Sequence, residues 1–199
     1  MPTTTNNGWT TPADTDLVKN GALAIRTLGN AIDTTLGVYA APGLVWLNTT
    51  SFSAVSSQSI SDVFSSTYTN YLLVFNGSTS GGSSVWMRLR VSGTDASGSN
   101  YTYQGLRGAT STADAFTGTS TAFLMTSNAS IANKFFTATV FKPNVAEPTF
   151  LISNTVEDVP VTSQIGNYHS LSTAYTGFTL IPITTGTITG TVSVYGIKK

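Results

Sequence analysis

Cysteine is absent from this chain of 199 residues, and charged residues are scarce. Without cysteine the chain has no disulfide, no thiol nucleophile and no cysteine-ligated metal site. Charged residues make up 9% of the sequence, against roughly 25% in an average globular protein. The nine basic residues balance the nine acidic ones, and a net charge of zero offers little attraction to a phosphate backbone. We therefore expect no nucleic-acid partner.

Long apolar runs are missing as well. The longest stretches, such as residues 71–75, are far too short to cross a bilayer as a helix. Residues 1–9 contain neither the basic nor the apolar region of a signal peptide, so we expect no membrane insertion. Serine, threonine, asparagine and glycine replace the missing charges, while 11% of the residues are aromatic. This composition is typical of a folded β-rich protein and not of a disordered chain.

Residues suited to catalysis are also few. His169 is the single histidine, and no Gly-x-Ser-x-Gly motif accompanies it, so a serine hydrolase triad is not indicated. A glycosidase needs two carboxylates that converge on one bond, but the acidic residues after residue 43 are scattered. Glu157 and Asp158 would point to opposite faces of an extended strand. No phosphate-binding loop, dinucleotide motif or metal-ligand spacing occurs. The sequence predicts no enzyme, no cofactor and no metal site.

The first part of the chain contains one amphipathic helix pattern, over about residues 12–36. Thr11 is a suitable N-cap, and Pro12 has the φ angle that the first helical residue requires. Gly37 supplies a C-terminal stop. A single helix of this length, interrupted by glycines, is not stable alone. The pattern therefore predicts that the helix packs against a partner.

The apolar stripe of this helix is formed by Val18, Ile25 and Ile32, which lie seven residues apart, together with Leu28. One interpretation is that the stripe packs on the β domain of the same chain. The other is a bundle of identical helices, which is favoured by β-branched residues at every seventh position beside small residues. We expect self-association through these four residues.

Trp9 is the one large apolar side chain of the polar segment 1–11. It either folds back on its own chain or anchors the segment in the pocket of a partner, since tryptophan is common at interface hot spots. Both interpretations stay open, and the second makes Trp9 a candidate docking residue.

From about residue 43 onward the pattern is one of short strands separated by turns. Residues 85–91 alternate cleanly between the two faces of a strand, and the continuous apolar run 71–75 predicts a central strand covered on both faces. No helix pattern lies between the strands, which indicates an antiparallel β-sandwich or jelly roll. The predicted strands are residues 44–48, 71–75, 85–91, 101–107, 122–126, 135–142, 149–155, 177–183 and 187–195.

Tyr101, Tyr103 and Arg107 lie on or beside one predicted strand, and the two tyrosines share a face. Exposed tyrosines offer a sugar flat apolar area with hydrogen-bonding tips. The alternative is that both tyrosines are core or rim residues of the sandwich. With that alternative open, we take these three residues as candidates for glycan binding.

Several stretches of the chain resemble a family of phage virion proteins identified as tail fibres or minor tail and structural proteins. They are WTTPADTDLVKNG at residues 9–21, AIRTLG at 24–29, ISDVF at 60–64, YTNY at 68–71 and GTITGTVSVYG at 186–196. The resemblance spans most of the chain. It implies a homotrimeric appendage that is attached to the virion by its N-terminus and contacts the host through a distal β domain. It implies no catalytic residues.

The residues and the resemblance together predict a non-enzymatic structural protein of the phage tail, a short trimeric tail fibre or baseplate appendage. Residues 1–42 would form the attachment segment and trimerising helix, with Trp9 docking on other tail or baseplate proteins. Residues 43–199 would form the β-sandwich that binds a host-surface glycan. The alternatives are a capsid decoration or spike protein and a glycan-cleaving tailspike.

Overall fold

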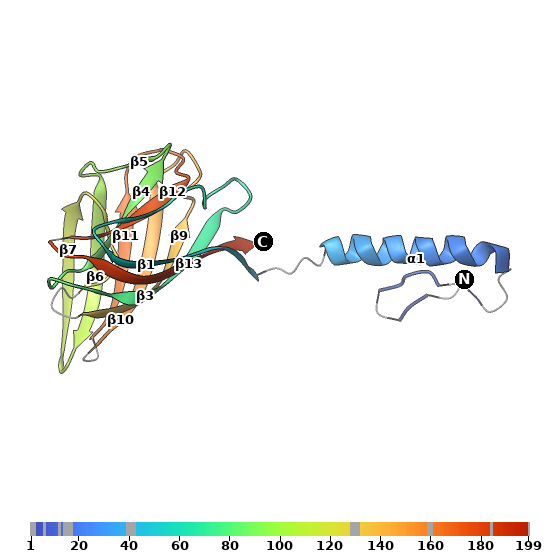
Figure 1. The fold of residues 1–199 in the computed structure, drawn as a ribbon, viewed down its shortest axis with the longest axis horizontal. Helices are drawn as coiled ribbons and strands as arrows, with labels where there is room; N and C mark the ends of the chain where they lie inside the picture. Colours follow the sequence, from blue (N-terminus) through green and yellow to red (C-terminus); the bar gives the residue numbers. More distant parts are fainter. Residues whose placement is uncertain are drawn as a thin grey trace. The chain divides into compact units, whose positions relative to one another are not determined.

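The computed structural model describes residues 3–5, 7–11, 13, 18–38, 43–127, 132–158, 161–183 and 185–198, without the side chains of residues 18, 19, 37 and 38. The chain divides into two compact units, Met1–Gly43 and Leu44–Lys198. The first contains the helix α1 (Val18–Val38), and the second contains the strands. The fold is therefore mainly β with one N-terminal helix, as the sequence predicts (Figure 1).

The helix α1 begins later and ends later than the sequence pattern predicts. Thr11 and Ala13 are not helical, while Pro12 and residues 14–17 of the predicted first turn lie outside the described residues. Gly37 does not stop the helix, which continues to Val38. A shift of two residues at a helix end is common, because terminal turns fray.

Near its end, α1 is linked to the segment before it. The indole Nε1 of Trp9 donates a hydrogen bond to Thr35 Oγ1 at 3.0 Å.

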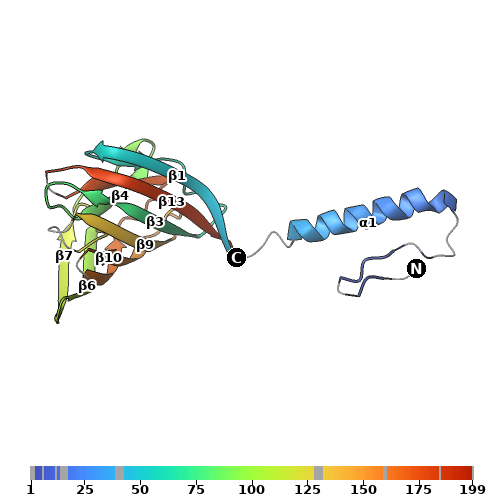
Figure 2. The same cartoon turned by 60° about the horizontal axis from the view of Figure 1, so that its bottom comes forward.

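In the described residues the strands form two antiparallel sheets. The larger sheet has eight strands in the order β1-β13-β3-β9-β10-β11-β6-β7, and the smaller has five, with the order β2-β12-β4-β5 and β8 paired with β4. Figure 2 shows β1, β13, β3, β9 and β10 side by side in this order. The strands are β1 (Gly43–Val55), β2 (Gln58–Ile60), β3 (Asn70–Thr79), β4 (Val85–Val91), β5 (Thr94–Asp95), β6 (Tyr101–Ala109), β7 (Thr112–Ser120), β8 (Phe123–Leu124), β9 (Asn133–Phe141), β10 (Thr149–Glu157), β11 (Val161–His169), β12 (Gly177–Pro182) and β13 (Ile188–Lys198).

The main hydrophobic core lies between the two sheets. Phe75 of β3 packs there in one cluster with Leu89 of β4 and Phe178 of β12, and all three side chains are fully buried. A smaller cluster around Trp86 and Ile165 fills the space under β6 and β7. Two sheets that enclose one core form a β-sandwich, which agrees with the predicted fold class.

Each of the nine predicted strand segments overlaps a strand of the structure. The predicted alternation in β4 largely holds. Val85, Met87 and Leu89 are buried in the main core, and Arg88 and Arg90 are half-exposed on the other side. Trp86, on the side of the arginines, is buried in the smaller cluster. The prediction for residues 71–75 is wrong in one respect. Tyr71, Leu73 and Phe75 are buried, but Leu72 and Val74 remain half-exposed on the side that no other sheet covers.

Candidate interaction surfaces

The apolar stripe of α1 is only partly covered within its own unit. Leu28 and Ile32 are half-buried, whereas Ile25 is 66% exposed and Leu36 is also exposed. The side chain of Val18 lies outside the described residues. An exposed isoleucine between half-buried neighbours leaves an apolar strip along the helix that another helix could bury.

Trp9 folds back on its own chain. Thr3 pairs with Thr10 as an isolated β-bridge, and the Trp9 backbone N–H donates to Thr4 Oγ1 at 3.0 Å. With the indole bonded to Thr35, this short hairpin lies alongside α1 (Figure 1). Trp9 is half-buried in this position. The local alternative of the sequence analysis is thus the one that the structure contains, and docking of Trp9 on a partner stays a prediction.

The structure places Tyr101 in the core. Its side chain is fully buried, and its hydroxyl accepts a hydrogen bond from Leu89 N–H at 3.1 Å and donates one to the Ala96 carbonyl at 2.8 Å. Burial raises the pKa of this hydroxyl, so it stays protonated. Tyr101 has no surface to offer a sugar, and the alternative that it is a core residue holds.

Tyr103 shares the inward side of β6 with Tyr101 and is half-buried. Its ring is perpendicular to that of Trp86, with centroids 5.7 Å apart. The same ring covers Gly118 on β7 so closely that a Cβ there would lie 2.5 Å from the tyrosine hydroxyl. Tyr103 is therefore held by contacts within the domain.

Arg107 keeps part of its guanidinium in solvent. It forms a bidentate pair with Asp114 on the neighbouring strand β7, through Nε to Oδ1 at 3.0 Å and Nη2 to Oδ2 at 2.9 Å. The side chains of Arg107 and Asp114 are 31% and 42% exposed. Arg107 therefore keeps polar atoms that a ligand can approach.

His169 lies in the core and not at a surface cleft. Its Nε2 is 2.6 Å from the Tyr175 hydroxyl, and its ring lies 4.1 Å from that of Tyr101. Burial lowers the pKa of His169 from its usual value of 6.5. A neutral, fully enclosed imidazole is a structural group here, because no substrate could reach it.

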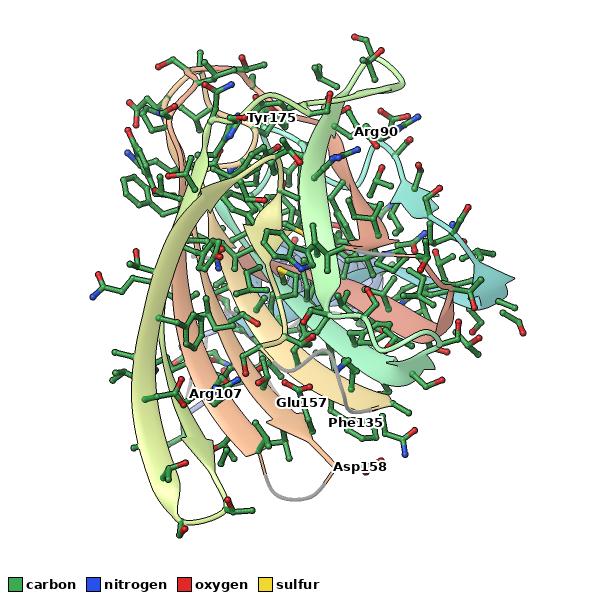
Figure 3. The ribbon with its side chains drawn as sticks, turned by 90° about the vertical axis from the view of Figure 1, so that its left-hand side faces the viewer. Arg90, Arg107, Phe135, Glu157, Asp158 and Tyr175 are labelled. Carbon is green, nitrogen blue, oxygen red and sulfur yellow. The ribbon has the colours of Figure 1, made fainter. Side chains whose placement is uncertain are left out.

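Four ion pairs occupy most of the acidic residues that the structure describes in the β domain. The pair of Lys134 Nζ and Glu157 Oε2 is fully buried at 2.7 Å, and Ser127 N–H donates to Glu157 Oε1 at 3.1 Å. Asp158, next to Glu157, is exposed. Figure 3 shows Glu157 and Asp158 near one end of the β domain and Tyr175 and Arg90 near the other. The other three pairs are Arg90–Asp95, Arg107–Asp114 and Lys142–Glu147.

Among the described residues, no group of three or more histidine, cysteine, aspartate or glutamate side chains is placed to hold a metal ion. No described helix is long and apolar enough to span a membrane.

The eight-stranded sheet also has a large apolar surface that was not predicted from the sequence. We call the side of this sheet that is turned away from the five-stranded sheet the outer face. Alternation along each strand sends every second side chain to it. Seven exposed large apolar residues lie there: Leu44 and Trp46 on β1, Phe135 on β9, Phe150, Ile152 and Val156 on β10, and Leu106 on β6.

Strand pairing brings these side chains together. Phe150 lies opposite Phe141 of β9 and Tyr168 of β11, and the rings of Phe150 and Tyr168 are 5.1 Å apart. Val156 lies opposite Phe135. Three shallow hollows, of about 470, 680 and 240 Å³, lie between these side chains along the outer face.

A sequence signal for this surface does exist. Phe135 and Phe136 are adjacent, as are Phe150 and Leu151, so large apolar residues fall on both sides of β9 and β10. Such a run is the same pattern that predicted a strand covered on both faces at residues 71–75.

Comparison of the chain with models of known protein families and with curated proteins found no match.

Proposed function

We propose that this protein is a non-enzymatic structural component of a phage virion, a short trimeric appendage of the tail or baseplate. It docks by its N-terminal unit and contacts the host through the β domain. In this proposal the docking end of the protein is formed by residues 9–21 and 24–29, which resemble phage tail proteins. They include the start of the described helix.

The observation that carries the proposal is the uncovered apolar stripe of α1. The helix belongs to a unit of its own, and Ile25 and Leu36 on its stripe are exposed. Isolated helices of about this length are marginal in water, and most of their stability comes from burying an apolar face. Three copies of α1 packed around a three-fold axis, with Val18, Ile25, Leu28 and Ile32 at the seam, would supply that burial.

Host recognition belongs to the β domain in this proposal. A neutral surface rich in hydroxyls and amides suits a host-surface glycan better than a charged polymer. The partly exposed pair of Arg107 and Asp114 offers N–H donors and carboxylate oxygens together, which are the groups that bind sugar hydroxyls. Of the candidates named from the sequence, Arg107 is the proposed contact residue.

Electron cryo-microscopy of the intact virion tests the proposal. We expect density for three copies of the chain at the tail or baseplate, with the helical ends toward the particle and the β domains outward. Density on the capsid would contradict the tail assignment and favour a decoration or spike protein.

Incubation of the purified protein with host polysaccharide tests the other alternative, since release of reducing ends would indicate a glycan-cleaving enzyme.

A further inference from the structure

The apolar side chains exposed on the β domain are not spread evenly over its surface. Ten large apolar residues of this domain are exposed among those described, and seven of them lie on the outer face. The other three, Val145, Leu171 and Ile183, lie outside the strands. Scattered apolar residues are normal on a protein surface, but a contiguous group on one face marks an interaction site.

Charge is distributed in the opposite way. The charged residues of the eight strands are Arg107, Asp114, Lys134 and Glu157, which lie on the inner side, and Lys198 at the end of β13. The outer face thus has no charged side chain among the residues described within its strands, and Asp158 follows β10 at its rim.

The outward side of the five-stranded sheet differs in this respect. It carries Arg88 and Arg90, and Asp95 pairs with Arg90 and accepts a hydrogen bond from Thr179 Oγ1 at 2.7 Å. Depletion of charge is a property of interface centres, whereas a solvated sheet face usually carries charges.

The outer face continues without a break from β1 to β6. Thr49 Oγ1 of β1 lies 2.9 Å from Ser193 Oγ of β13, and Trp46 Nε1 donates to the same Thr49 oxygen at 2.9 Å. Ser193 lies opposite Val74 of β3. The outer face therefore runs across the sheet from Leu44 and Trp46 on β1 to the apolar residues of β3, β9, β10 and β6. Hydroxyl side chains of β1 and β13 lie between these two apolar groups.

From these observations we propose that the outer face of the eight-stranded sheet is the contact through which the β domains of identical subunits pack on one another. The inference rests on the proposed trimer and adds a second contact to it, independent of the helix. In this arrangement the three outer faces turn toward the common axis. Leu72 and Val74 of β3, which are half-exposed in the single chain, are then covered.

The patch supplies a large part of the area that such a contact needs. With the exposed fractions of its seven side chains and roughly 150–250 Å² for a large residue, the patch presents on the order of 700 Å² of apolar surface. A stable protein interface buries about 800 Å² of polar and apolar surface on each partner. In a trimer each subunit shares its face between two neighbours, so the polar side chains of the outer face contribute the remaining area. The short connection from α1 also holds the β domains of one trimer close together, which raises their effective concentration.

A second copy fits this face better than a glycan does. Leu106, Ile152 and Val156 are aliphatic, and sugars bind mainly to flat aromatic rings framed by polar groups. Two copies of an uncharged face can also meet without burying an unpaired charge. The shallow hollows between the side chains are open to side chains of a neighbouring subunit.

Single cysteines test the proposal in the full chain, which has no cysteine of its own. In the isolated subunit Leu106 is 65% exposed and Leu171, in the loop after β11, is 42% exposed. A thiol from Leu106→Cys should therefore react with maleimide at least as fast as one from Leu171→Cys if the outer face is open. In the assembly we expect Leu106→Cys to react roughly tenfold more slowly, because a thiol must be accessible to react.

A second pair of variants separates burial between subunits from local effects. Ile152 and Leu171 have the same exposure, 42%. Adding Ile152→Asp to the Leu106→Cys chain should restore fast labelling, because it places a charge in the contact, whereas adding Leu171→Asp should leave labelling slow. Dilution to concentrations at which sedimentation finds monomers should also restore fast labelling.

Other outcomes would overturn the inference. Fast labelling of Leu106→Cys in a chain that sediments as a trimer would leave the helical trimer standing and remove the outer-face contact. A monomer at micromolar concentration would contradict both. Fast labelling that host polysaccharide alone slows would make the outer face a glycan site.

Discussion

Two residues that look suited to chemistry, His169 and Glu157, are structural in this domain. His169 lies against the ring of Tyr101 and beside the Tyr175 hydroxyl. Glu157, the last residue of β10, is buried together with Lys134, near the start of β9. Both buried side chains have a partner in the core, His169 the Tyr175 hydroxyl and Glu157 the Lys134 ammonium. Buried polar groups generally have such partners. Removal of His169 or Glu157 should change stability and leave the exposed surfaces unchanged.

Replacement of Lys134 by methionine should destabilise the protein by about 3–5 kcal/mol, because it leaves Glu157 buried without its cation. The double variant Lys134→Met, Glu157→Leu should lose much less, since no charge is then left unpaired. Chemical denaturation of the three chains measures both free energies of unfolding. A single variant as stable as the native chain would show that the pair is open to water.

Acidification from pH 7 to 5.5 should lower the free energy of unfolding by up to about 1 kcal/mol through His169. The folded state holds the pKa of His169 below 6.5, so the unfolded chain binds a proton first as the pH falls. Stability is therefore fully present above pH 6.5 and is lost below it. The His169→Phe variant should differ by a constant offset and lack this slope, and equal slopes in both chains would contradict the assignment.

At the scale of single elements, α1 has two apolar sides with different expected roles. Ile25 belongs to the series spaced by seven residues, whereas Leu23 projects from the opposite side of the helix, because each residue advances by about 100°. Their exposures are 66% and 62% in the single chain. This similarity makes them a matched pair.

Ile25→Asp should dissociate or strongly weaken the helical bundle, because each subunit would bring a charge into an apolar seam. Leu23→Asp should leave the association unchanged. Sedimentation velocity over a concentration series compares the two variants with the native chain. Equal behaviour of the two variants would place the seam elsewhere on the helix.

Most strands were predictable from sequence because apolar residues alternate along them, as in β4. Four strands were missed, the short β2 and β5 and the longer β7 and β11. The patterns of β7 and β11 are mostly threonine, serine, glycine and amides. Val161 and Ile165 are the buried large apolar residues of β11. Both strands form because neighbours on the sheet pair with them, β11 between β10 and β6 and β7 at the edge. A single sequence does not contain this tertiary contribution.

The candidate sites were less predictable than the strands. Alternation correctly put Tyr101 and Tyr103 on one side of β6, but it does not tell which side of a strand faces the core. The outer face depends on the register of eight strands, which brings residues from distant parts of the chain together. The sequence indicates this face only in part, through the large apolar residues on both sides of β9 and β10.

At the scale of the whole molecule, we expect attachment and recognition to be separable. A shortened chain that begins at Gly43 should unfold cooperatively with a β-type circular dichroism spectrum, because the core between the sheets lies entirely within Leu44–Lys198. It should keep any binding to host cells and fail to join virions. Incorporation of the shortened chain into particles would show that docking runs through the β domain.

Sedimentation equilibrium of the full chain tests the central claim of a self-associating appendage most directly. We predict a single species of three times the chain mass of 20.8 kDa at micromolar concentration. A monomer under the same conditions would contradict the account, because both the stripe of α1 and the outer face would then remain exposed to water.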